Sequence, residues 1–121
     1  MAFLYPIAFI PQLQYRLWGG NKLSAQLHKN DHGEKKGESW EVSAVPGFDS
    51  EVANGPHKGK TLTELIDAFP KEIMGLSVVE KFGKTFPLLF KFIDAKISLS
   101  VQVHPNDALA KERHNSYGKN E

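Results

Sequence analysis

The chain has 121 residues, of which 40% are hydrophobic and 24% are charged, and its formal net charge is +1. This size and balance fit one small globular domain, and they exclude a disordered chain and a polyelectrolyte built to bind nucleic acid. Because the sequence has no cysteine, any metal must be held by histidine, carboxylate or amide groups. The first residues lack a basic leader and no stretch approaches the ~20 apolar residues of a membrane span, so we expect no export or membrane signal and a cytoplasmic location.

The N-terminal part predicts short β segments around one helix. Residues 4–9 are largely apolar, and Pro6 within them and Pro11 after them favour an edge strand or an extended arm. Residues 17–20 predict a turn, residues 21–27 can form one short helix, and residues 28–36 predict a charged loop.

The next part of the chain predicts successive β-turn-β elements. Residues 38–45 alternate polar and apolar side chains, as a strand does, and the Pro46-Gly47 pair then predicts a turn. Further loop signals lie at residues 54–56 and 58–60. A helical insertion over residues 61–75 interrupts the series.

This insertion opens with a capping box, in which Thr61 is the N-cap and Glu64 is the third helical residue. Pro70 interrupts the helix, and a further turn then closes at Gly75. The apolar residues fall on one face of the helix, which predicts core packing and no chemistry. They are Leu62, Leu65, Ile66 and Phe69.

Residues 86–94 form a short apolar run that predicts a strand buried on both faces. Lys91 lies in its middle, and a buried ammonium without a partner is costly. The lysine must therefore reach the surface, pair with a carboxylate or face a polar cavity. Spacing alone favours the surface, whereas the polar face of the next segment favours the cavity.

Residues 98–105 alternate with the period of a strand, and Pro105 ends the run. Ser98, Ser100, Gln102 and His104 would share one face. An amide two residues before an imidazole can grip a metal ion. The same face could equally be the wet side of an ordinary antiparallel strand.

Several motifs occur together in one order: WGG at 18–20, GESWE at 37–41, VANGP at 52–56, GKTL at 59–62, FPLL at 86–89, Lys91, SVQVHP at 100–105 and GKNE at 118–121. In this order they resemble the type I phosphomannose isomerases, zinc-dependent mannose-6-phosphate isomerases of the cupin superfamily. The resemblance implies a mainly β fold, a cupin-like jelly roll in the form of a partial barrel with one or two short helices inserted. Residues 1–121 would then be the N-terminal part of the catalytic domain, with the rest of the barrel and a second β domain absent.

The resemblance also implies a set of site residues. Gln102, His104 and Glu121 match three zinc ligands, and the fourth, a distal histidine, lies outside the chain. Lys91 and Glu38 match catalytic positions. By their neighbours alone, Glu121 would be a solvated glutamate, and Glu38 could equally be a surface strand residue.

Two further residues match substrate-binding positions of the family. The hydroxyl of Ser100 suits a phosphate, and Trp18 matches the wall of the active site, although it could simply be core.

Val45 stands where many relatives have a histidine, so no role transfers there. The remaining histidines lie among polar residues and are expected at the surface: His28, His32, His57 and His114.

The implied reaction is the reversible interconversion of mannose 6-phosphate and fructose 6-phosphate through a cis-enediol. It needs a base at C2, which these residues do not identify, and an electrophile for the oxyanion, for which Zn²⁺ is suited. We expect a sugar phosphate as the partner, with neither nucleic acid nor membrane, and little activity from these residues alone. Exposed strand edges would favour self-association. The alternative is a cupin-like domain that binds a small ligand without turnover.

Overall fold

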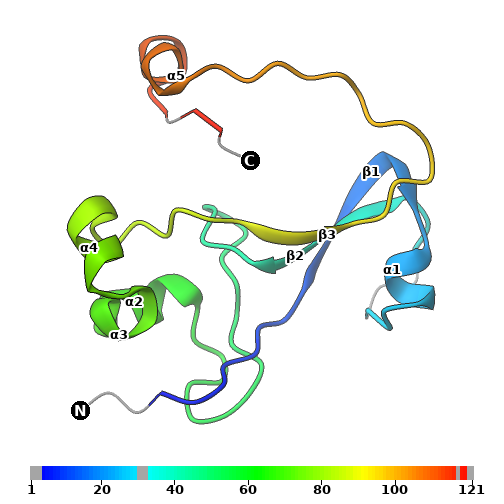
Figure 1. Cartoon of the computed structure of the whole chain (residues 1–121). Coiled ribbons are helices and arrows are strands. Elements are labelled where there is room, and N and C mark those ends of the chain that lie inside the picture. The colour runs from blue at the N-terminus through cyan, green and yellow to red at the C-terminus, as the bar shows by residue number, and fades with distance from the viewer. Residues whose placement is uncertain (1–3, 30–32, 117, 120–121) are drawn as a thin grey trace.

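The structure, a computed structural model, describes residues 4–29, 33–116 and 118–119. Its centre is an antiparallel three-stranded sheet in the order β1-β2-β3 (Figure 1). The strands are β1 (Gln12–Gly20), β2 (Lys36–Val42) and β3 (Phe90–Ile93). The strand predicted from the alternation over residues 38–45 is confirmed in β2. Because β2 lies between the other two, side chains from all three strands can meet on one face of the sheet.

Helix α1 (Lys22–Ala25) follows β1 directly, as predicted for residues 21–27. Its Asn21 N-cap makes no side-chain hydrogen bond. Instead the backbone N–H of Lys22 donates to Oδ2 of Asp94, at 2.8 Å, and this carboxylate is buried. The start of α1 is thereby tied to the residue that follows β3.

The turn predicted over residues 17–20 is wrong, because β1 continues through Gly20. The backbone oxygen of Trp18 accepts hydrogen bonds from the N–H groups of Lys96 at 2.8 Å and Ile97 at 3.2 Å. Gly19 also forms an isolated bridge with Ala95. Gly19 thus pairs with this later segment, and Gly20 pairs with Lys36 of β2. These distant partners hold both glycines extended, which local turn propensity does not predict.

Three short helices follow the long connection after β2: α2 (Leu62–Ala68), α3 (Pro70–Met74) and α4 (Leu76–Phe82). The predicted capping box is confirmed. The N–H of Glu64 donates to Thr61 Oγ1 at 3.2 Å, and the N–H of Thr61 donates to Glu64 Oε2 at 2.9 Å. The break at Pro70 and the end at Gly75 are also confirmed, whereas α4 was not predicted.

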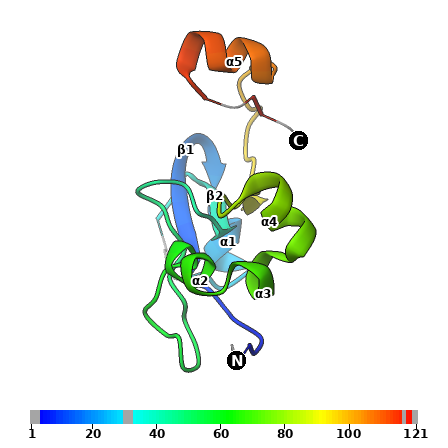
Figure 2. The same ribbon diagram turned by 90° about the vertical axis from the view of Figure 1, so that its left-hand side faces the viewer.

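The buried apolar residues gather where α2 meets the connection from β2. Val52, Leu62, Leu65 and Ile66 are each at most 2% exposed. The N-terminal residues lie alongside as an extended arm, as predicted, with hydrogen bonds from the Ile10 N–H to Glu51 O and from the Ala53 N–H to Ala8 O. Figures 1 and 2 both show the three helices grouped together on this side of the molecule.

The run over residues 86–94 forms a strand only at β3, and the prediction that it is buried on both faces is wrong. Phe90, Phe92 and Ile93 are 51%, 51% and 53% exposed. Within the described residues β3 is an edge strand that pairs with β2 alone, and its apolar side chains on both faces stay about half exposed, so no layer covers either face fully. An apolar run can indicate a strand that is suited to burial, but other helices or strands must pack over that strand before it is buried.

The predicted strand over residues 98–105 is also wrong in this structure. The segment is extended and exposed, with Val101 and Val103 at 98% and 94% exposure. Alternation produces a strand only where a neighbouring strand offers hydrogen-bond partners, and none of the described strands lies beside these residues.

Beyond Pro105 the chain forms α5 (Asp107–His114), which was not predicted and is capped by Asn106. Both views show α5 standing away from the sheet (Figures 1 and 2). The described residues form five helices, so the expectation of one or two was too low. None of these helices has the length and apolar character that crossing a bilayer requires.

Candidate functional site

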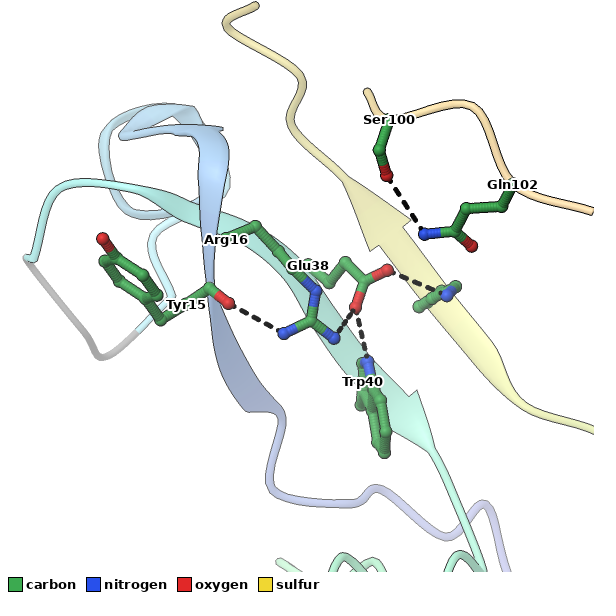
Figure 3. Close-up of polar contacts among 7 residues, drawn as sticks. Tyr15, Arg16, Glu38, Trp40, Ser100 and Gln102 are labelled. Carbon is green, nitrogen blue, oxygen red and sulfur yellow. Dashed lines mark hydrogen bonds and ion pairs between the residues drawn. The ribbon is translucent and has the colours of Figure 1, made fainter. Parts of the chain in front are cut away.

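The candidate site lies on one face of the sheet and centres on Glu38 of β2. Trp40 lies two residues further along β2 and points to the same face. The residue that pairs with Trp40 on the neighbouring strand β3 is Lys91. Arg16 reaches this face from β1 (Figure 3). Each of the three strands therefore supplies at least one polar side chain.

The carboxylate of Glu38 accepts hydrogen bonds from three donors. Lys91 Nζ lies 2.9 Å from Oε1. Arg16 Nη2 lies 2.6 Å from Oε2, and Trp40 Nε1 donates to the same oxygen at 3.1 Å (Figure 3). The carboxylate is thus held from both sides, with each oxygen assigned to different donors.

The burial of these groups is uneven. The Glu38 side chain is 8% exposed, whereas those of Lys91 and Arg16 are 24% and 34% exposed. Burial by itself would raise the pKa of Glu38. The hydrogen bonds from Lys91 and Trp40 and the charges of Lys91 and Arg16 outweigh it and hold the pKa below the ordinary glutamate value. Glu38 is therefore ionised at neutral pH.

Of the alternatives for Lys91, the structure shows pairing with a carboxylate. Glu38 is a buried strand residue and not a surface one. Trp18 lies on β1, half-buried. These three predicted site residues share the sheet.

The predicted metal and phosphate residues lie apart, on the extended segment after β3. The Gln102 Nε2 group donates to Ser100 Oγ at 3.2 Å, and both side chains are exposed (Figure 3). His104 is exposed as well. Glu121, the third predicted ligand, lies outside the described residues.

The donor set fits zinc in chemical type. Because the Gln102 amide nitrogen faces Ser100, its carbonyl oxygen is left as a ligand atom, and His104 offers an imidazole nitrogen. Across residues 4–29, 33–116 and 118–119, however, no three His, Cys, Asp or Glu side chains are gathered as a metal site. The described part of the chain thus holds two donors of the proposed set without a third beside them.

A cavity of about 270 Å³ lies at the end of β1. Gly19, Gly20, Lys35 and Lys96 are among the residues that line it. None of the predicted site residues that the structure describes lines it.

Arg16 and Trp40 were not identified from the sequence. Trp40 could have been found, because it lies two residues after Glu38 on a predicted strand. No comparable signal marks Arg16. Among the predicted surface histidines, His28 and His114 are exposed, but His57 is half-buried and stacks on Tyr5 at 5.8 Å. His32 lies outside the described residues.

Comparison with known proteins places the chain in a family. Residues 7–120 match the family described as phosphomannose isomerase type I, catalytic domain. The chain is 44% identical over 118 residues to the probable mannose-6-phosphate isomerase GmuF of Bacillus subtilis, covering 97% of this chain and 36% of that protein. It is 40% identical over 116 residues to the mannose-6-phosphate isomerase of Streptococcus mutans, covering 96% of this chain and 35% of that one.

Solved structures agree. The mannose 6-phosphate isomerase of Bacillus subtilis superposes with a TM-score of 0.82 at 38% identity, over 93% of this chain and 35% of that one. The Salmonella typhimurium enzyme bound to fructose 6-phosphate and zinc superposes with a TM-score of 0.73 at 27% identity, over 90% and 28% of the two chains. The chain thus spans roughly a third of the length of these relatives. It belongs to the type I phosphomannose isomerase family, within the catalytic domain.

Proposed function

We propose that this chain is part of a zinc-dependent aldose-ketose isomerase that interconverts mannose 6-phosphate and fructose 6-phosphate. The observation that carries the proposal is the match of residues 7–120 to the catalytic domain of the family. A relative of similar fold is bound to fructose 6-phosphate and zinc, which supports both the substrate and the metal.

The reaction moves a proton from C2 to C1 of the open-chain sugar through a cis-enediol, and it needs cationic groups near the developing oxyanion and the phosphate. We assign Lys91 to the anionic oxygens of the sugar phosphate. Its ammonium is partly exposed and carries two N–H groups beyond the one given to Glu38. Ser100 is assigned to the phosphate and Trp18 to the wall of the substrate site.

Gln102, His104 and Glu121 would hold the zinc ion. When bound, the metal supplies a positive charge that stabilises developing negative charge on the sugar. In this proposal residues 1–121 are the N-terminal part of a cupin-like jelly-roll domain, whose remaining strands would pair with β3 and with residues 98–105. The exposed apolar side chains of β3 support this, and they also support the prediction that the chain by itself self-associates and has little activity. A cytoplasmic location stays a prediction from the sequence.

Zinc content and turnover of the complete gene product that carries these residues test the proposal. We expect about one zinc per chain and isomerisation of mannose 6-phosphate, with both lost in Gln102→Ala and in His104→Ala. His114→Ala, which removes an exposed imidazole from α5, is the matched control and should retain both. Unchanged metal content and turnover in the first two variants would contradict the ligand assignment. Zinc binding without turnover of the complete product would favour the non-catalytic domain.

A further inference from the structure

The Glu38 carboxylate is divided between two cations that come from opposite sides of β2. Oε1 faces Lys91 of β3, and Oε2 faces Arg16 of β1. One negative charge therefore serves two positive ones, and the cluster carries a net charge of about +1 with Glu38 ionised. Arg16 occupies acceptor capacity that Lys91 would otherwise use, so Glu38 orients the lysine without fully neutralising it.

Three local features direct Arg16 onto this carboxylate. The β1–β2 register shifts between Gln14 and Tyr15, immediately before Arg16, and such a bulge re-aims the side chains that follow it. Arg16 then donates from its backbone N–H to Lys35 O at 2.8 Å. Its Nη1 group donates to Tyr15 O at 2.7 Å, which fixes the guanidinium in place (Figure 3).

Gly37 makes room for the approach. A Cβ atom built on Gly37 would lie 2.6 Å from Trp18 Cζ3, 2.7 Å from Arg16 Cβ and 2.9 Å from Arg16 Cγ. Contacts this short do not occur, so any other residue at 37 would have to displace the Trp18 ring and the arginine stem. The absent side chain of Gly37 and the bulge on β1 together give Arg16 one defined path to Glu38.

We propose that Arg16 is a positioning residue: it fixes the Glu38 carboxylate from the β1 side, so that Oε1 holds the Lys91 ammonium toward the anionic oxygens of the substrate. This inference rests on the proposed function, in which Lys91 contacts the sugar phosphate. In this arrangement Glu38 acts on the substrate through Lys91, whose ammonium it orients.

A double-mutant cycle in the complete gene product tests this role. Arg16→Met should lower kcat/KM for mannose 6-phosphate about tenfold, the size of one charged hydrogen bond. If Arg16 acts through Lys91, the same change should cause no further loss in a Lys91→Met background. Arg16→Lys, which keeps the charge, should restore part of the activity. The control Arg113→Met removes the other arginine, exposed on α5, and should leave kcat/KM unchanged.

A second readout requires no turnover. In the 121-residue chain labelled with ¹³C at the glutamate carboxyls, Arg16→Met should raise the pKa of Glu38, because a positive neighbour is lost, and should shift the side-chain signals of Lys91. Arg113→Met should change neither.

The kinetic and NMR measurements distinguish a failure of the proposed function from a failure of the positioning role of Arg16. Absence of isomerisation by the wild-type product would refute the proposed function, and the NMR titration alone would then decide the role of Arg16. A Glu38 pKa and Lys91 signals that Arg16→Met leaves unchanged would overturn the positioning role. Losses in kcat/KM that add in the double variant would overturn it as well, because a general structural effect predicts additivity.

Discussion

Replacement of Glu38 by glutamine is the most direct test of the charge cluster, because it removes one charge and keeps the shape of the side chain. Glutamine retains one carbonyl acceptor but turns an NH₂ group toward either Lys91 or Arg16. A hydrogen bond to a charged group contributes ~1.5–3 kcal/mol, so the loss of two of the three bonds sets an upper bound of ~3–6 kcal/mol. The cations are 24% and 34% exposed and can turn to water, which reduces the expected loss to about 2–3 kcal/mol.

Urea unfolding of the chain at pH 7 measures this free energy. The matched control is Glu41→Gln on the same strand. The Glu41 carboxylate is 23% exposed and pairs with one lysine, Lys29, at 2.9 Å. We expect the Glu41→Gln variant to lose about 1 kcal/mol or less of unfolding free energy.

The stability difference between wild type and Glu38→Gln depends on pH. The pKa of Glu38 in the folded chain is below its ordinary value of 4.5, so its stabilisation is fully present above pH 4.5 and is lost as the pH falls through the folded-state pKa. The stability difference between wild type and Glu38→Gln should therefore shrink under acid conditions. Equal stabilities at pH 7, or a difference that grows as the pH falls, would refute the reasoning.

Two further predictions concern the scaffold. Thr61→Ala removes the side chain of the capping box and should destabilise the chain by about 1 kcal/mol in urea unfolding, whereas Thr63→Ala, exposed on the same helix, should cost less; equal effects would contradict the capping role. Gly55→Ala should lower the thermal unfolding midpoint more than Gly59→Ala. Both glycines have positive φ, but only at Gly55 would the new Cβ meet a side chain, the Tyr5 ring; equal shifts would show that the ring moves aside freely.

Local signals in the sequence predicted the elements that need no distant partner. The Thr61 capping box and the end at Gly75 were predicted because each depends on residues within one turn of helix. The charge pattern also restricted Lys91 to three outcomes, and pairing with a carboxylate was one of them. For the capping box the energy that decides the structure is visible in neighbouring residues, whereas the partner that decides the outcome for Lys91, Glu38, lies 53 residues away in the sequence.

Other features depend on pairing between distant segments. Gly19 and Gly20 remain in β1 because residues 95–97 bond to that end of the strand, which a turn signal does not contain. Arg16 reaches Glu38 through a register shift and the space above Gly37. Residues 98–105 have the alternation of a strand, but no described strand lies beside them.

These differences divide the candidate site into two parts with different requirements. The Arg16, Glu38 and Lys91 part is assembled by the backbone pairing of β1, β2 and β3, so it requires neither metal nor further strands. Gln102 and His104 lie on a segment with exposed valines and an unpaired backbone. A neighbouring strand must pair with this segment before the Gln102 and His104 side chains can share one face. Ordering of that segment would cost conformational entropy, which metal coordination and strand pairing would have to offset. The anion-directed part of the site can therefore exist before the metal part, and the Glu38 titration should be readable in a chain that holds no zinc.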